Sequence, residues 1–356
     1  MSTVATVAPK VSATSVAFAY PDPGRELSAV RLVQELQRPR VGPEFIRAPR
    51  ARTWRLAFPR PDVDRMEYLL ELETDGAYET VTDPSNPLRA PGPWGDKSAI
   101  EFPGYRPPEW VEADAPEGTL RALEIRSRAY RANVPVLIWS SPGTQASERL
   151  PLLIAHHGPE YAAYAALVKY LDVMVDRGEL PPMRAALLDP IDRDQSYSAA
   201  AAWARTLAND VLPMLHEVAP HPPRPRLRIG MGASLGALAA LHGHRQDHDL
   251  FGALFLQSGS FFRPRWDRHE EWHPRYHRII RFVGRTHLGK DASPVPVTIT
   301  CGTAEENLAN NRALADALDA QGYDVRLSEQ RDAHNWTAWR DSFHPHLTEL
   351  LQRQWP

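Results

Sequence analysis

The sequence has one cysteine, almost no net charge and no long apolar run, and each shortage removes a class of protein. Cys301 alone cannot form a disulfide framework within the chain or a zinc ribbon. The 41 basic and 44 acidic residues leave a formal net charge of -3, without the basic excess of a dedicated nucleic-acid binder. No apolar run reaches the ~18 to 20 residues that span a bilayer, and the first twenty residues lack the apolar stretch of a secretory signal. We therefore expect a cytoplasmic protein with no nucleic-acid or membrane partner.

The length of 356 residues predicts about two domains, and 43% hydrophobic with 24% charged residues is typical of a globular protein. The 34 prolines cluster and help to place the boundaries. We expect a disordered segment at 1–15, a small all-β sandwich at 16–112 and an α/β domain at 113–356. The proline-rich stretch Pro103 to Trp110 is the predicted linker.

Three segments before residue 112 alternate β-branched or aromatic residues with others, the pattern of half-buried strands: SVAFAYP, TWRLAFP and MEYLLELE. Turn-forming residues separate them, and no long amphipathic helix appears there. From Thr119 the pattern changes to short apolar strands between helices. Trp203, Leu207, Val211 and Leu215 mark one face of a helix over residues 199–218. Such alternation predicts a mainly parallel sheet covered by helices.

The sharpest local signal is Gly232-Ala233-Ser234-Leu235-Gly236, a G-x-S-x-G sequence between an apolar strand and an Ala/Leu-rich helix. In a nucleophile elbow, a strained turn lifts the serine hydroxyl clear of the sheet, and small residues two positions away let the backbones approach. The helix N-terminus points free N–H groups at a developing oxyanion. An ordinary Gly/Ser turn is the alternative, and the flanking strand and helix make it the weaker one.

A serine hydroxyl needs a base, and in an α/β-hydrolase the order along the chain is serine, acid, histidine. His334 follows the last predicted strand and precedes the final helix, so we predict that it is the base. The acid should follow the strand PVTITCG. Glu305 is preferred and Glu306 is the alternative, although both also suit the N-terminus of a helix.

The backbone N–H of Leu235 is the first predicted oxyanion donor. The second should come from the loop that follows the strand LPLLIAHH. Pro159 has no N–H to give, so we expect the donor to be Glu160 or Tyr161. An ordinary turn that donates nothing is the alternative for this loop.

These residues resemble the enterochelin esterase (ferric-enterobactin esterase) family of α/β-hydrolases, which is related to esterase D and feruloyl-esterase-like proteins. The resemblance covers nearly the whole chain and is carried by HHGPEY, LPPMRAALLDPIDR, VLPML, IGMGASLG, LFLQSGSFF, TCGTAEEN, NNRAL and AHNWTAWRDSF. It implies an α/β-hydrolase domain preceded by an immunoglobulin-like domain. The family's serine and histidine fall on Ser234 and His334. Some members look like Ser-His dyads, and His157-Gly158 stands where the family commonly has Asp-Gly.

The segment Arg263 to Lys290 follows the strand after the elbow, within a cap-like region expected at 262–291. It carries seven arginines, interleaved with aromatic residues. Arginine forks and aromatic faces suit an anionic, aromatic ligand such as a ferric catecholate siderophore. The predicted substrate contacts are Arg263, Arg265 and Trp266, with Arg193 from another strand end. A solvated charged loop explains the same pattern equally well.

The same segment contains HEEWH, His269 to His273, which formally matches the H-E-x-x-H of zinc proteases. Pro274 follows directly and disfavours helical geometry at His273. No third ligand follows at a comparable spacing. We therefore predict no metal and no other cofactor.

Three hypotheses result. The first is a serine esterase with a Ser234, His334 and Glu305 triad, acting through an acyl-enzyme on a small-molecule ester such as that of a ferric siderophore. The second is an acetyl or feruloyl esterase of glycans that uses the sandwich as a binding module. The third is a binding or scaffold protein that sequesters a siderophore without turnover.

Overall fold

The computed structural model describes residues 8–37 and 42–355, and these form two compact units. The N-terminal unit runs to Arg106 and includes two later segments, Gly302–Glu306 and Arg331–Asn335. The C-terminal unit holds the rest of the chain from Pro107. The sequence predicts a single boundary at 112. The prediction lacks the two later segments. A single boundary along the chain cannot assign a loop from the second domain to the first, even when the loop packs there.

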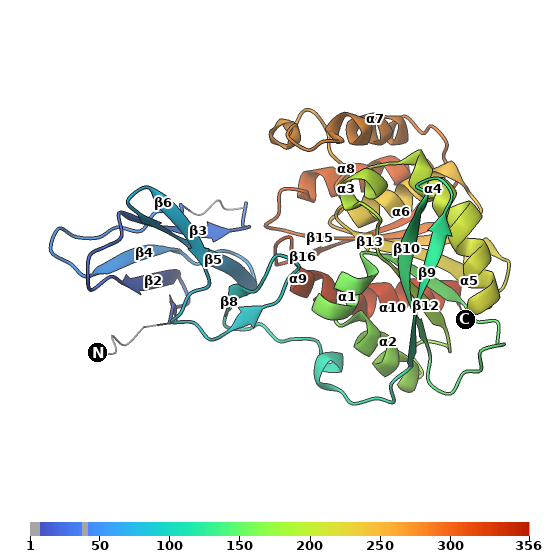
Figure 1. The fold of residues 1–356 in the computed structure, drawn as a ribbon, viewed down its shortest axis with the longest axis horizontal. Coiled ribbons are helices and arrows are strands. Elements are labelled where there is room, and N and C mark those ends of the chain that lie inside the picture. Colours follow the sequence, from blue (N-terminus) through green and yellow to red (C-terminus); the bar gives the residue numbers. More distant parts are fainter. Residues whose placement is uncertain (1–7, 38–41, 356) are drawn as a thin grey trace. The chain divides into compact units, whose positions relative to one another are not determined.

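The N-terminal unit contains two antiparallel sheets (Figure 1). In strand β2 (Ser15–Pro21), Val16 and Phe18 point inward, as the alternating pattern predicts. Trp54 and Tyr68 lie in the core, whereas Trp94 is 90% exposed. The first sheet is β1 (Lys10–Val11), β2 and β4 (Thr53–Pro59). The second is β3 (Ala29–Gln34), β5 (Arg65–Thr74), β8 (Lys97–Glu101) and β7 (Arg89–Ala90), with β6 (Ala77–Val81) paired to β5.

Two expectations at the edges of this region need correction. Within the segment expected to be disordered, Lys10 pairs opposite Ala17, so β1 forms part of a sheet; residues 1–7 lie outside the described residues. The predicted linker ends in a short 3-10 helix, Glu109–Glu112, whose Trp110 is buried in the C-terminal unit against Tyr170 and Phe343. A large apolar ring gains more from burial than from exposure on a linker.

The C-terminal unit is built on an eight-stranded sheet in the order β16-β15-β14-β13-β11-β12-β10-β9. The pairs from β12 through β11, β13 and β14 to β15 are parallel, whereas β9, β10 and β12 are antiparallel. The sheet is therefore mainly parallel, as predicted, with antiparallel strands β10 and β9 at one edge. The strands are β9 (Thr119–Ser127), β10 (Ala132–Ser140), β11 (Leu152–His156), β12 (Arg184–Leu188), β13 (Arg228–Ala233), β14 (Ala253–Gln257), β15 (Pro296–Gly302) and β16 (Asp324–Gln330).

Helices cover both faces of this sheet (Figure 1). Leu152 and Ile154 of β11 face one apolar cluster, and Leu153 and Ala155 face the other, as period-two strands buried on both sides must. The helices are α1 (Gly158–Tyr164), α2 (Leu167–Asp176), α3 (Arg193–Tyr197), α4 (Ala201–Thr206), α5 (Leu212–Val218), α6 (Leu235–Gln246), α7 (Tyr276–His287), α8 (Leu308–Asp319), α9 (Trp336–Asp341) and α10 (Thr348–Gln354).

The helical face predicted at 199–218 is confirmed. Trp203, Leu207, Val211 and Leu215 are all at most 1% exposed and lie in one apolar cluster. A π-helical turn, Leu207–Val211, joins α4 to α5. Among the described residues, no helix is both long and apolar enough to cross a membrane.

Candidate active site

Ser234 lies at a strained turn between β13 and α6. Its φ of 54° and ψ of -122° are unusual for a residue with a Cβ, and its N–H donates to the carbonyl of Gln257 at 2.9 Å. A Cβ at Gly232 would lie 2.4 Å from the carbonyl carbon of Gly236, so only glycine fits there. The turn therefore has the geometry that the G-x-S-x-G sequence predicts, with the serine at the N-terminus of a helix.

Ser260 is a neighbour of the nucleophile candidate that the sequence analysis missed. Its Oγ lies 3.0 Å from Oγ of Ser234, and its backbone N–H donates to the Ser234 carbonyl at 3.2 Å. Ser260 is 3% exposed and follows β14, the strand next to β13. Its signal was the sequence QSGS at the end of that neighbouring strand, where side chains collect at the carboxyl edge of the sheet.

His334 and Glu305 form an ion pair within the N-terminal unit. Nδ1 of His334 lies 2.7 Å from Oε2 of Glu305, and the other carboxylate oxygen accepts a hydrogen bond from the Gly302 N–H. Glu305 is 1% exposed, while the His334 side chain is 29% exposed. Of the two glutamates that the sequence leaves open, Glu305 is the one that the structure shows in this contact. This arrangement can hold the imidazole in one tautomer and stabilise its cation.

The electrostatic surroundings of His334 favour the protonated ring. Burial opposes the charged form, but the charge and hydrogen bond of Glu305, together with Glu35 and Glu306, outweigh it and raise the pKa of His334 above 6.5. A base with a raised pKa takes a proton more readily once it is neutral. The ring is therefore suited to accept the proton of an alcohol.

The predicted oxyanion loop begins helix α1 at Gly158. The Tyr161 N–H donates to the His157 carbonyl at 2.9 Å and is thus already used by the helix. The N–H groups of both predicted donors are thus engaged in the structure, that of Tyr161 by the helix and that of Glu160 by its own carboxyl. Glu160 lies in the first turn, where helix N–H groups have no partner within the helix, as does Leu235 in α6. The Glu160 carboxyl interacts with its own backbone N–H, and burial raises its pKa.

His157 and Tyr197 lie beside the elbow and were not assigned a role from the sequence. Their rings are in edge-to-face contact with centroids 4.8 Å apart, and the Tyr197 hydroxyl accepts the His157 N–H at 3.2 Å. Burial, with the charges of Arg193 and His156, holds the pKa of His157 well below its usual value. His157 is therefore a neutral ring at neutral pH, and its interaction with the Ala233 backbone ties the predicted oxyanion loop to the elbow.

The arginine-rich segment divides into two parts. The guanidinium of Arg265 lies 3.7 Å from the ring centroid of Trp266, and that of Arg263 lies 5.4 Å from it. Trp266 is 38% exposed. Arg278, in contrast, donates to the carbonyls of Ser198 and Gln195 and so anchors α7 to the end of α3. The predicted contacts Arg263, Arg265 and Trp266 therefore form one group, and the arginines of α7 belong to the scaffold or the surface.

Arg193 is about half exposed and pairs with Asp194 at 3.1 Å. Its charge acts on His157, Glu160 and Tyr197, which places it near the predicted oxyanion loop.

The HEEWH sequence has no α-helix: Arg268–Glu270 is a short 3-10 helix, and Nδ1 of His273 accepts the Arg275 N–H. His269 and His273 therefore do not share one face of an α-helix, which is the arrangement that a zinc protease requires.

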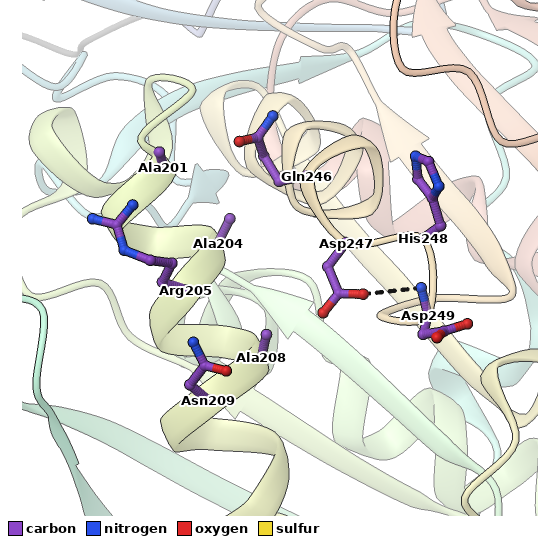
Figure 2. Close-up of a pocket in the computed structure, with 9 residues that line it drawn as sticks. All are labelled: Ala201, Ala204, Arg205, Ala208, Asn209, Gln246, Asp247, His248 and Asp249. Atoms are coloured by element: carbon purple, nitrogen blue, oxygen red, sulfur yellow. Dashed lines mark hydrogen bonds between the residues drawn. The ribbon is translucent and has the colours of Figure 1, made fainter.

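A cavity of about 490 Å³ lies at the far end of α6 (Figure 2). Helix α6 has 12 residues, so this cavity is about 18 Å along the helix from Ser234. Its polar lining has both signs of charge, with Arg205 and Asp247 coming from different helix ends, and the Asp247 carboxylate already accepts the Asp249 N–H at 3.0 Å. This cavity does not belong to the elbow.

Comparison with known proteins identifies the class. The family model described as "Putative esterase" matches residues 130–350. The Iron(III) enterobactin esterase of Escherichia coli O6:H1 is 29% identical over 302 residues, which are 83% of this chain and 73% of that protein. The chain therefore belongs to this esterase family, and its resemblance to the enterochelin esterases is confirmed.

Solved structures show the same fold. The enterochelin esterase of Shigella flexneri superposes with a TM-score of 0.79 at 20% identity, covering 98% of this chain and 96% of that one. A structure of that esterase in the presence of enterobactin gives a TM-score of 0.77 at 20% identity, covering 97% and 95%. A ferulic acid esterase gives 0.58 at 15% identity, covering 66% and 99%. The C-terminal unit thus has an α/β-hydrolase-like esterase fold.

Proposed function

We propose that this protein is a serine carboxylic-ester hydrolase in which Ser234, His334 and Glu305 act as a triad. The observation that carries the proposal is the strained Ser234 at a helix N-terminus, in a chain whose predicted base His334 and preferred acid Glu305 form a 2.7 Å ion pair. The loops with Glu305 and His334 follow β15 and β16 of the sheet that also contains β13. In α/β-hydrolases these strand ends supply the acid and the base.

The reaction proceeds through an acyl-enzyme. His334 takes the proton of the Ser234 hydroxyl while Oγ attacks the ester carbonyl, and Glu305 stabilises the imidazolium. The backbone N–H of Leu235 and a second N–H from the loop that begins α1 hold the oxyanion. His334 returns the proton to the leaving alcohol. Water, deprotonated by His334, then attacks the acyl group and releases the acid and the serine.

We further propose a ferric catecholate siderophore as the substrate. Relatives named Iron(III) enterobactin esterase support this, as does the structure of the Shigella flexneri enzyme with enterobactin. Arg263 is three residues from Ser260, so its Cα lies at most about 11 Å from that of the residue that contacts Ser234. Arg263, Arg265 and Trp266 therefore offer cationic and aromatic contacts to a trianionic, aromatic ester near the nucleophile. Arg193 is proposed as a further contact.

The N-terminal sheets are proposed to be of the immunoglobulin-like type that the resemblance implies.

The decisive experiment is hydrolysis of short p-nitrophenyl esters and of a ferric catecholate siderophore by the wild type and Ser234→Ala. We expect the variant to lose ~10³-fold or more of kcat. The matched control is Ser147→Ala, which changes an exposed serine and should leave the rate unchanged. Equal rates for wild type and Ser234→Ala would remove the proposal. A folded wild type that binds the siderophore tightly without hydrolysing it would leave a binding protein instead.

A further inference from the structure

The loops that carry Glu305 and His334 pack as parts of the N-terminal unit. Ala304 precedes Glu305, and Ala333 precedes His334. These alanines are 1% and 4% exposed, respectively, and lie in the apolar cluster of the N-terminal unit. The Ala304 carbonyl accepts the Gln37 N–H at 2.7 Å, and the Arg331 carbonyl accepts the Asp64 N–H at 2.6 Å. Both loops are therefore held by backbone groups of the β-sheet unit and not only by the strands that precede them.

Asp332 joins the two loops. It is 5% exposed, and its Oδ1 accepts hydrogen bonds from the Ala333 N–H at 2.7 Å and from Nδ2 of Asn335 at 2.9 Å, on either side of His334. Its carbonyl accepts the Ala304 N–H at 3.2 Å, next to Glu305. A Cβ at Gly302 would lie 2.3 Å from that same carbonyl oxygen, so the two loops meet at a distance that only glycine permits.

The second carboxylate oxygen of Asp332 faces a buried cation. Nη1 of Arg65, on β5, lies 3.9 Å from Oδ2 of Asp332 and 3.4 Å from Oε1 of Glu67. All three side chains are less than 10% exposed. Lys97 on β8 lies 4.0 Å from Glu67 on its other side. A buried guanidinium must be compensated by nearby negative charge, so Arg65 ties the position of Asp332 to strand β5.

The charge of this group is finely balanced. Burial raises the pKa of Asp332 to about 7, against the charge of Arg65 and the hydrogen bonds from Ala333 and Asn335; Glu67 adds to the rise. The His334 ring is in turn affected by Glu305, Glu35 and Glu306. The ionisable groups that affect the pKa of Asp332 or of His334 are thus Arg65, Glu67, Glu305, Glu35 and Glu306.

We infer that Asp332 and Arg65 are positioning residues for His334. The inference rests on the proposed function of His334 as base. Three of the four polar contacts of the Asp332 residue described above go to the two loops that carry His334 and Glu305, and the fourth goes to β5. We call these contacts of Asp332 the brace. Without the brace, His334 can leave the orientation in which its Nδ1 meets Glu305. A displacement of about 1 Å at a catalytic group can cost about a hundred-fold in rate.

The test compares three variants of the full chain. Asp332→Ala removes the brace, and Asp332→Asn keeps an acceptor for Ala333 and Asn335. Asp83→Ala is the matched control, because Asp83 is equally buried in the same unit but bonds Tyr68 and Ser85 instead of the catalytic loops. We expect Asp332→Ala to lower kcat about ten-fold or more with KM within two-fold, and Asp332→Asn to recover most of it. Asp83→Ala should lose stability without losing kcat per folded molecule.

A second measurement separates positioning from a purely structural role. The acidic limb of kcat/KM reports the pKa of His334 in the free enzyme. It should move down toward ~6.5 in Asp332→Ala, where Glu305 no longer holds the ring, and stay near the wild-type position in Asp332→Asn. If Asp332→Ala does not fold, Asn335→Ala tests the same brace from its other side, with an expected loss of several-fold in kcat.

Two outcomes would overturn the inference: a kcat for Asp332→Ala within two-fold of wild type, or equal kcat losses in Asp332→Ala and Asp83→Ala at the same folded fraction. The Ser234→Ala variant distinguishes a failure of the positioning role from a failure of the proposed function. An inactive Ser234→Ala with an unaffected Asp332→Ala rejects only the positioning role. An active Ser234→Ala rejects the proposed function itself.

Discussion

Nδ1 of His334 lies 2.7 Å from a carboxylate oxygen of Glu305 that is almost completely buried. A ring that donates from Nδ1 to this carboxylate has Nε2 available as the basic nitrogen. The pair raises the pKa of His334, although burial alone would lower it. The contact therefore sets both the tautomer and the basicity of the proposed general base.

We predict that activity rises with pH through a midpoint above 6.5, because the neutral form of His334 is the base and its pKa is raised. Glu305→Gln should lower kcat by about a hundred-fold or more and move this midpoint down. The measurement is kcat/KM for a p-nitrophenyl ester between pH 5 and pH 9, at intervals of about half a unit, where a histidine base titrates. Glu306→Gln is the control and should keep most of the activity. A midpoint that is the same in wild type and Glu305→Gln would contradict the role of this pair.

The same pair should affect stability in a defined direction. Because the folded-state pKa of His334 is raised, its contribution is fully present below the unfolded value of about 6.5 and is lost as pH rises through the folded-state value. The difference in unfolding free energy between wild type and Glu305→Gln should therefore shrink from pH 6 to pH 9. Urea unfolding at several pH values measures it. A difference that grows over this range would show that the assigned direction is wrong.

Ser260→Ala should lower kcat by about two- to ten-fold, because one hydrogen bond to the Ser234 hydroxyl is worth about 1 kcal/mol. The Oγ atoms of these serines are 3.0 Å apart, so the contact limits the rotation of the nucleophile. KM and thermal stability should change little. A rate increase in Ser260→Ala would show instead that Ser260 holds the hydroxyl away from its reactive orientation.

Arg265→Ala and Trp266→Ala should raise KM for the ferric catecholate without affecting the hydrolysis of p-nitrophenyl acetate. The reason is that the Arg265 guanidinium and the Trp266 ring, 3.7 Å apart, present charge and an aromatic face to an anionic, aromatic ligand. Arg285→Ala is a matched control, because Arg285 lies in the same segment but pairs with Asp291. Equal effects of all three variants would mean that the segment contributes only general positive charge.

Gly232→Ala should destabilise the protein by about 1–3 kcal/mol or more, since the new Cβ meets the Gly236 backbone at 2.4 Å. Gly284→Ala in α7 is the control: no atom lies within 4 Å of its added Cβ, and alanine favours the helix. Thermal unfolding of both variants measures the difference. Equal melting temperatures would show that the elbow tolerates a side chain and is not tightly packed.

The sequence predicts the elbow well, because its chemistry depends on residues that are adjacent in the chain. G-x-S-x-G between an apolar strand and an Ala/Leu helix is a local pattern, and β13, Ser234 and α6 follow it. The helical face from Trp203 to Leu215 and the strand 53–59 are equally local. Strand β9 was missed, because its residues from Thr119 to Leu123 are mostly exposed and carry no apolar run.

Contacts between distant residues could not be predicted in the same way. Ser260 meets Ser234 only because β14 lies beside β13, which a sequence pattern does not reveal. The assignment of 302–306 and 331–335 to the N-terminal unit depends on burial of Ala304 and Ala333, two residues with no distinctive signal. The arginines of 263–290 look alike in the sequence, and only the structure separates those beside Trp266 from Arg278.

The most direct measurement of the central claim is the rate at which a fluorophosphonate probe labels the protein, with the modified residue located by peptide mass spectrometry. We expect labelling of Ser234 in the wild type and a rate at least about a hundred-fold slower in His334→Ala, because the serine then lacks its base. Labelling at another residue, or equal rates in wild type and His334→Ala, would contradict a nucleophilic Ser234 activated by His334.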